Sequence, residues 1–214
     1  SKTYPKYEYC VQYQESDFDF IQRLFQQEGI FYFFEHSNSN HTLVLADDIT
    51  AYEVCNEGKV VFSTGHLSES HVSRWQGGLS IAPGSFKRVG YDFKLPTQSV
   101  SEIFEYTGEQ ECHPRAANLA SVQLESLQRD MKLSSGRSDC RSFTVGKLFS
   151  FKKHEDPRLE GKTFVITSMM TSITVPNQSG SQQSSVEEVY SNHFECVPKE
   201  IPYRAQINKK KPVI

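Results

Sequence analysis

The sequence predicts an α+β protein that is mostly β, with a small antiparallel β-barrel and a smaller α+β subdomain. The chain of 214 residues contains fifteen Phe and ten Tyr against one Trp, and aromatic residues together with β-branched ones favour strands. Two segments have the apolar spacing of amphipathic helices, and several others alternate polar and apolar residues between turn-forming clusters. One long helix and several strands joined by turns indicate a partly closed barrel.

The first element is a helix over residues 16–28. Ser16 can act as its N-cap, and Asp19, three residues later, supplies the acidic side of a capping box. Gly29 provides the left-handed residue that ends the helix. The apolar residues at helical spacing are Phe18, Ile21, Leu24 and Phe25. We expect this face to close a small core with the strand that follows.

A β-hairpin over residues 30–47 comes next. The run Ile-Phe-Tyr-Phe-Phe at 30–34 predicts a strand buried on both faces, because it is short and carries five large side chains. The sequence Ser-Asn-Ser-Asn at 37–40 is typical of a turn, and residues 41–47 predict the returning strand.

An internal boundary is predicted near Pro96. We expect an α+β subdomain over 1–98, a β-barrel over 99–205 and a linker over 206–214. Within the barrel, a helix over 114–132 begins with Pro at its first position and has apolar residues at 3-4-3-4 spacing. These residues are Ala117, Ala120, Leu124, Leu127 and Met131.

Further strands are predicted on both sides of this helix. They cover residues 86–94, 102–109, 141–152, 162–175 and 186–197, with a polar loop at 176–185. In the third of these strands, alternate positions place Phe143, Val145, Phe149 and Phe151 on one face.

Composition argues against several classes of function. The formal net charge of −3 favours neither nucleic acid nor an acidic membrane surface. No apolar run approaches the roughly 18 residues of a membrane span. The cysteines are odd in number and contain no Cys-x-x-Cys, so they predict neither a disulfide framework nor a zinc ribbon. They are Cys10, Cys55, Cys112, Cys140 and Cys196, and we interpret them as reduced, buried residues.

Candidate catalytic and metal-binding residues are few. The pairs His36–His41 and His66–His71 are each five residues apart, and we interpret them as surface histidines because a third ligand is not apparent. We found neither a Gly-x-Ser-x-Gly motif nor a phosphate-binding glycine loop.

Three further features have a structural interpretation that outweighs the functional one. Asp47 and Asp48 follow a strand and favour capping over cation binding. Trp75 could stack on a sugar, but a lone Trp is more often part of a core or interface. Glu187 and Glu188 point to opposite faces of a strand, which argues against joint acid–base work. We therefore predict no enzyme activity, no catalytic, cofactor-binding or metal-ligating residues, and no cofactor.

Several long motifs resemble the VgrG proteins, the trimeric spike components of type VI secretion systems. The first is the segment at 12–18, Gln-Tyr-x-Glu-Ser-Asp-Phe, which leads through Glu28, Gly29 and Ile30 into an aromatic strand. The remaining matching positions are Tyr32, Phe33, Phe34 and Leu45 to Asp47, the Tyr-Asp-Phe-x-x-Pro segment at 91–96, and the segments at 192–204 and 211–214. Residues 104–118 depart from the family because they lack the usual Pro-Gly after Tyr106.

The resemblance implies a phage tail hub-like fold and a structural role in the spike. The family members trimerise, cap the secreted hexameric tube protein Hcp, help to puncture target membranes, and carry effectors with baseplate and adaptor proteins. They assemble in the bacterial cytoplasm and are then secreted or translocated into a target cell. The resemblance also implies that an oligonucleotide-binding-fold domain and a β-helical needle follow residue 214 in the family.

Three alternatives stay open. The chain could be the hub of a related contractile phage-like injection system, an effector-type enzyme, or a carbohydrate-binding module for which Trp75 is the main indication. The basic run at 209–211 is interpreted as a solvated linker rather than a nucleic-acid patch. Whether this part of a spike trimerises without the needle is also open.

Overall fold

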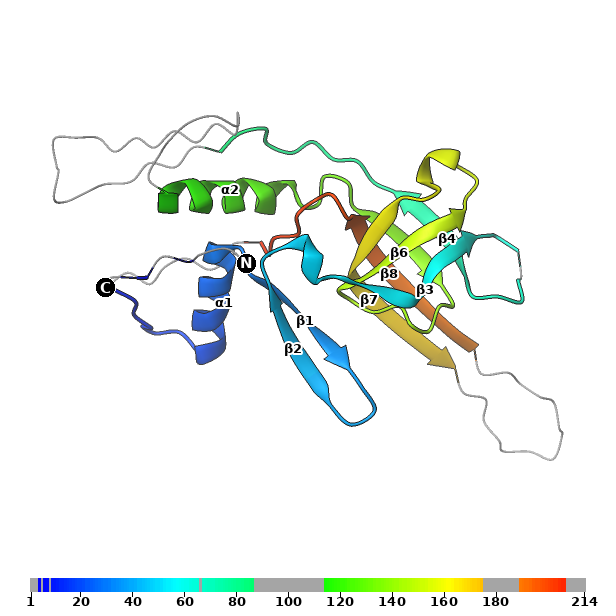
Figure 1. The fold of residues 1–214 in the computed structure, drawn as a ribbon, viewed down its shortest axis with the longest axis horizontal. Helices are drawn as coiled ribbons and strands as arrows, with labels where there is room; N and C mark the ends of the chain where they lie inside the picture. The colour runs from blue at the N-terminus through cyan, green and yellow to red at the C-terminus, as the bar shows by residue number, and fades with distance from the viewer. Residues whose placement is uncertain are drawn as a thin grey trace. The chain divides into compact units, whose positions relative to one another are not determined.

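The computed structural model describes residues 4, 6–7, 9–65, 67–86, 114–174 and 189–206, without the side chains of 114–118 and 189. The chain forms two compact units, here named the helical unit and the barrel unit. The helical unit comprises residues 1–51, 80–131 and 202–214, and the barrel unit comprises residues 52–79 and 132–201. Figure 1 labels both helices and most of the strands.

The helical unit begins with α1 (Asp17–Glu28). Ser16 accepts a hydrogen bond from the backbone N–H of Asp19 at 3.2 Å, and Gly29 ends the helix with a φ of 75°. Both predicted caps are therefore confirmed, because each depends on side-chain and backbone chemistry within a few residues.

The predicted hairpin is also confirmed. β1 (Phe31–His36) pairs antiparallel with β2 (His41–Ala46), and Figure 1 shows the hairpin next to α1. Its turn is closed by the backbone N–H of Ser37, which donates to the carbonyl of Asn40 at 2.8 Å. A short 3₁₀ turn, η1 (Ile49–Ala51), follows the hairpin.

The expectation that this aromatic strand is buried on both faces was wrong. Phe31 and Phe33 are buried, whereas Phe34 is exposed. Side chains alternate between the two faces of a strand, and a two-stranded hairpin offers one face to the core. Only alternate members of the aromatic run are therefore buried.

The apolar face predicted for α1 is not the buried face either. Phe18 and Ile21 are 61% and 46% exposed. The buried residues of α1 are Arg23, Gln26 and Glu28. The spacing of apolar residues correctly identified one side of α1 as apolar. The side that is buried carries Arg23, which pairs with Glu15.

The long helix is four residues shorter than the predicted 114–132. α2 (Pro114–Gln128) ends in a turn in which the N–H of Met131 donates to the carbonyl of Gln128 at 3.0 Å. Its buried residues include Ala120, Val122, Leu124 and Ser126, while Leu127 is exposed. Ser134, Ser135 and Gly136, which follow this turn, begin the next strand.

The barrel unit contains six strands in the closed order β3-β4-β5-β8-β7-β6 (Figure 1). Their bounds are β3 (Glu53–Phe62), β4 (His71–Gly77), β5 (Ser134–Ser138), β6 (Lys147–Lys153), β7 (Thr163–Thr174) and β8 (Val189–Pro198). β3 is parallel to both of its neighbours, and the other pairs are antiparallel. The mostly β fold with a barrel is confirmed, although the barrel is closed and mixed rather than partly closed and antiparallel.

Aromatic rings fill the barrel core. Its largest buried side chains are Phe143, Phe149, Phe151 and Phe194, and Phe164 packs with them. Phe143 and Val145 precede β6 in a turn, so the segment 141–152 is not one continuous strand. They still pack on the same core as Phe149 and Phe151, which is the grouping that their spacing predicted.

The two units differ from the predicted division into residues 1–98 and 99–205. β3 and β4 lie before residue 98 and belong to the barrel, whereas α2 lies after residue 99 and belongs to the helical unit. Spatial contacts define a compact unit, and this chain passes between its units more than once. Some predictions concern residues outside the described ranges. They are the boundary near Pro96, the strands at 86–94 (except Phe86) and 102–109, the loop at 176–185, and residues 207–214 of the linker.

Candidate functional site

The residues singled out for metal or capping chemistry lie at turns. His36 and His41 face each other at the turn end of the hairpin. Across the described residues, no three His, Cys, Asp or Glu side chains are grouped to hold a metal ion. Asp48 accepts a hydrogen bond from the Thr50 N–H at 2.9 Å, which confirms its capping role. His66, Cys112, Glu187 and Glu188 lie outside the described residues.

The cysteine thiols of the barrel are buried, whereas Cys10 in the helical unit is exposed. Burial raises the pKa of the Cys140 thiol to about 12, and it raises the pKa of Cys196 well above its ordinary value. Because the thiolate is the reactive form, these two residues are suited to packing rather than to nucleophilic chemistry.

Trp75 is part of the barrel core. Its ring meets Phe151 and Phe164 edge-on, with centroids 4.9 and 5.0 Å away. Edge-to-face contacts of this kind stabilise aromatic clusters. The structural interpretation of Trp75 is confirmed, and the geometry gives little support to a sugar-stacking platform.

A polar node joins α1, β2 and α2 of the helical unit. Arg204 is 5% exposed, and its Nε donates to Oε2 of Glu125 at 2.6 Å. Its Nη1 donates to the carbonyls of Gly29 and Asp47 at 2.8 and 2.9 Å. A planar guanidinium offers several fixed donors, so one side chain connects the ends of α1 and β2 with the last turn of α2. These four residues are named the Arg204 node.

A second ion pair fixes the segment before α1. Arg23 lies on the buried side of α1, and its Nη2 and Nε donate to the two carboxylate oxygens of Glu15 at 2.6 and 3.1 Å. The same Nη2 donates to the carbonyl of Val11 at 3.3 Å. The hydrogen bond from Arg23 lowers the pKa of Glu15. Because the guanidinium binds both oxygens of the carboxylate, the pair fixes the relative orientation of the two side chains.

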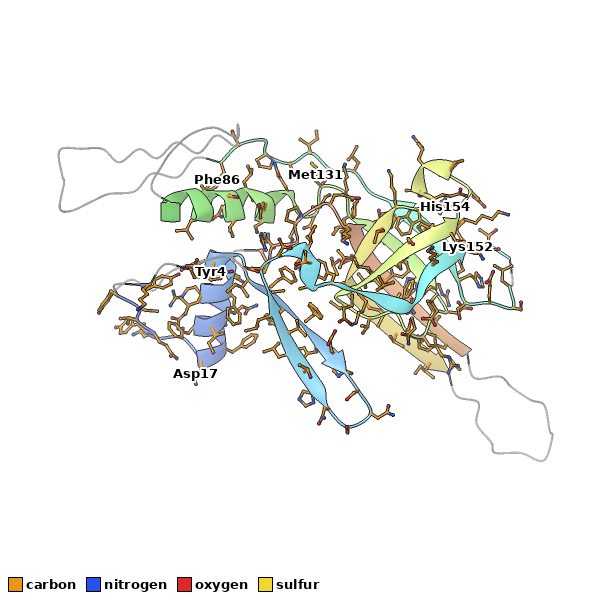
Figure 2. The ribbon with its side chains drawn as sticks, in the orientation of Figure 1. Tyr4, Asp17, Phe86, Met131, Lys152 and His154 are labelled. Atoms are coloured by element: carbon orange, nitrogen blue, oxygen red, sulfur yellow. The ribbon has the colours of Figure 1, made fainter. Side chains whose placement is uncertain are left out.

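Polar contacts at the start of α1 and just after β2 complete the framework. Gln12 donates to the carboxylate of Asp17 at 2.7 Å, and the Tyr4 hydroxyl donates to Asp47 at 2.7 Å. Burial and this hydrogen bond raise the pKa of Tyr4. Figure 2 labels Tyr4 and Asp17. Most of the signature residues in this part of the chain therefore have structural roles: Gln12, Glu15, Ser16, Asp17, Gly29 and Asp47.

The other side of the helical unit is apolar and open. Phe25 of α1 contacts Tyr32 of β1, with ring centroids 6.4 Å apart, and Tyr32 contacts Phe34 at 6.3 Å. In the hairpin register, Leu45 and Leu43 lie opposite these two strand residues. We name this surface the apolar face and define it by Phe18, Ile21, Phe25, Tyr32, Phe34, Leu43 and Leu45. Contiguous exposed apolar surface marks interaction sites.

No helix in the described ranges has both the length and the apolar character of a membrane span. The side of α1 away from the apolar face carries its buried polar and charged residues, Arg23, Gln26 and Glu28. The apolar face is suited to contact with another folded protein surface.

Residues 1–177 match the family described as phage tail baseplate hub (GPD). The chain belongs to this family. Among its relatives is the type VI secretion system spike protein VgrG1c of Pseudomonas aeruginosa, which is 30% identical over 178 residues. That alignment covers 75% of this chain and 24% of the relative.

A second relative, the actin cross-linking toxin VgrG1 of Vibrio cholerae, is 26% identical over an alignment of 234 positions, gaps included. That alignment covers 96% of this chain and 20% of the toxin. The chain thus spans about a quarter of the length of the curated relatives that it matches. The predicted resemblance to VgrG spike proteins is confirmed.

The fold is similar to that of a solved type VI secretion component. The E. coli c3393 protein, described as structurally similar to the T4 bacteriophage tail proteins gp27 and gp5, aligns with a TM-score of 0.66 and 18% sequence identity. The alignment covers 98% of this chain and 45% of that protein. The predicted hub-like fold is therefore confirmed.

Proposed function

We propose that this chain forms the hub part of a trimeric type VI secretion spike and acts as a structural component rather than an enzyme. The match of residues 1–177 to the phage tail baseplate hub family carries the proposal. The spike proteins among its relatives favour a type VI system over another contractile injection system.

The arrangement of the described residues suits a part that transmits force. A closed barrel has no unpaired edge that could separate first under load. In the helical unit, the Arg204 node connects two backbone carbonyls and a carboxylate that are far apart in sequence. The closed barrel stabilises the barrel unit and the Arg204 node stabilises the helical unit, each without any covalent step.

The apolar face supports trimerisation through the helical unit. Phe18 and Leu45 are 61% and 51% exposed, although full burial of one such side chain contributes roughly 1.5–3 kcal/mol. A symmetric assembly would bury this face once per subunit, and obligate interfaces are apolar in this way. We therefore assign the face to contact with a second copy of the chain.

In the assembled spike, we propose that the hub caps the tube protein Hcp and contributes to membrane puncture and effector delivery with baseplate and adaptor proteins. The family resemblance implies a second barrel in each subunit, so a trimer would present a pseudo-sixfold ring of barrels that matches a hexameric tube. Assembly would take place in the bacterial cytoplasm, before secretion into a target cell.

Light scattering of the full-length protein that contains this chain tests the proposal. We expect a trimer at micromolar concentration, and a monomer would contradict it. The variant Leu45→Glu should weaken the trimer by about tenfold or more, because a buried carboxylate without a partner is unfavourable. The matched control is Ile173→Glu, which changes an equally exposed aliphatic residue of the barrel unit and should leave the mass unchanged.

An enzymatic role is a second candidate, because one relative is named as an actin cross-linking toxin. The chain covers 20% of that protein, so we propose that such an activity belongs to the rest of it. Incubating this chain with actin and ATP should produce no covalent actin oligomers, and a ladder of oligomers would support the enzymatic alternative.

A further inference from the structure

Two arginines lie directly opposite each other on the outer face of the barrel. Arg74 of β4 pairs in register with Arg137 of β5, and Arg137 pairs with His193 of β8. All three side chains are exposed. Like charges at directly opposed positions repel each other, so this arrangement needs a reason beyond the stability of the sheet.

The described residues supply little to offset the repulsion. Within the described ranges, no carboxylate lies at ion-pair distance from Arg74 or Arg137. In the same ranges, the side chains of the two arginines make one hydrogen bond, in which Nη2 of Arg137 donates to the hydroxyl of Ser191 at 3.3 Å. The guanidinium groups are therefore available to an outside partner.

An open groove of about 460 Å³ lies on the same face of the barrel unit. It crosses β4, β5, β8 and β7, and it is lined by Arg74, Gln76, His193, Glu195, Met170 and Phe194, among others. Gly136 lies in its floor between Trp75 and Phe194 in the register. The groove therefore combines Arg74 with an apolar floor and polar walls, and Arg137 adjoins it on β5.

We propose that this groove, with the adjoining Arg137, binds an acidic segment of a partner protein. Arginine suits this role because its planar fork can hold a carboxylate through two hydrogen bonds. Neighbouring strands are about 4.8 Å apart and alternate residues of an extended segment about 6.7 Å apart. Two flexible arginines on adjacent strands can therefore meet two carboxylates of one extended segment.

A nucleic acid fits the groove less well. Glu195 lies in its wall and would repel a continuous phosphate backbone. The chain as a whole carries a formal net charge of −3, whereas nucleic-acid-binding surfaces are usually strongly basic. A protein segment can place carboxylates at the arginines and neutral side chains near Glu195.

This inference does not depend on the proposed spike function. The groove belongs to the barrel unit alone, and its ligand chemistry can be measured without any secretion machinery. A loss of acidic-peptide binding would leave the hub proposal untouched, and a monomeric full-length protein would leave the groove proposal untouched.

The test measures binding of a fluorescein-labelled octapeptide of alternating Glu and Ser to the 214-residue chain by fluorescence anisotropy at low salt. The probes for comparison are the same peptide with Gln in place of Glu and a single-stranded oligothymidine of equal length. The variant is Arg74→Gln with Arg137→Gln. The matched control is Lys152→Gln with Lys153→Gln, which removes the same charge from exposed positions of β6; Lys152 is labelled in Figure 2.

We expect the arginine variant to weaken binding of the Glu peptide by about tenfold or more and the lysine control to weaken it by less than about twofold. The thermal unfolding midpoint of the arginine variant should be at least as high as that of the parent, because the change removes a repulsive pair. Absence of binding to the Glu peptide, equal weakening by both variants, or tighter binding of the oligothymidine would each overturn the proposal.

Discussion

Arg204 and Glu125 form an ion pair between positions 79 residues apart, with 2.6 Å between Nε and Oε2. Arg204 is 5% exposed, so water has little access to replace its partners. The same side chain holds two backbone carbonyls. The stability of the helical unit should therefore depend strongly on this one residue.

We expect Arg204→Ala to lower the free energy of unfolding by about 3–5 kcal/mol, because it leaves a partly buried carboxylate and two carbonyls without their donor. Urea unfolding followed by circular dichroism measures the change. The control is Arg158→Ala, since the Arg158 side chain is 86% exposed and pairs with nearby Asp156. An equal loss of unfolding free energy in both variants would show that the Arg204 node contributes no more to stability than an exposed ion pair.

Gly29 combines a left-handed backbone with a crowded environment. Its φ is 75°, and an added Cβ would lie 2.8 Å from Cγ2 of Val122. Gly161 has a φ of 73° and open space around it. Gly161→Ala should therefore lower the free energy of unfolding by the backbone contribution of about 1–2 kcal/mol, and Gly29→Ala by at least about 1 kcal/mol more.

Thermal and urea unfolding of both glycine variants test this prediction. Adding Val122→Ala to Gly29→Ala should recover part of the difference, because it removes the methyl groups that the new Cβ meets. Identical losses in the two single variants would mean that α2 can move away from Gly29 without penalty.

Gly136 should tolerate no side chain in the barrel. An added Cβ would meet the Phe194 ring and lie 3.0 Å from the carbonyl of Arg74, whereas a Cβ at Gly77 would have nothing within 4 Å. We expect Gly136→Ala to lower the free energy of unfolding by about 1–3 kcal/mol and Gly77→Ala to be neutral or slightly stabilising. Trp75 fluorescence reports the unfolding of the barrel directly, and a stable Gly136→Ala barrel would refute the prediction.

His154 should make the barrel sensitive to mild acid. Its ring stacks on Phe62 with centroids 4.6 Å apart, and Figure 2 labels it near Lys152. Burial lowers the pKa of His154 below the usual 6.5, although Asp156 and other nearby carboxylates act in the opposite direction. The folded protein therefore binds this proton more weakly than the unfolded chain does.

The consequence for stability follows from linkage. The contribution of His154 is fully present above about pH 6.5 and is lost as the pH falls from there toward the lowered pKa. His154→Asn keeps an acceptor for the Asp156 N–H, which now donates to Nδ1 at 2.9 Å, and removes the titration. Urea midpoints between about pH 5 and pH 7.5 should show a shallower slope for this variant, and an unchanged slope would assign the acid sensitivity to other groups.

Local chemistry explains which parts of the fold could be predicted. The N-cap of Ser16 and the left-handed Gly29 depend on neighbours within one helical turn, and the turn at 37–40 depends on its own four residues. The aromatic residues near β6 were grouped correctly because their burial follows from size and apolar character. The family resemblance added the hub-like architecture, which these patterns did not contain.

The exposed side of α1 and the two arginine ion pairs were not predicted. The sequence shows that α1 has an apolar side, but Phe18 is exposed and Arg23 is buried. In the sequence, Glu125 directly follows Leu124, which is buried in α2, and a carboxylate at such a position needs a partner. Nothing in the neighbouring residues indicates that this partner is Arg204.

By itself, the sequence determined the caps, the hairpin, the mostly β character and the absence of a recognisable catalytic motif. Only the tertiary structure decided that β3 and β4 close the barrel with strands from the second half of the chain. It also decided that Arg204 reaches Glu125 and that Arg74 lies opposite Arg137. Strand pairing and buried charge pairs are contacts between distant positions, so their free energy depends on the path of the whole chain rather than on any short stretch.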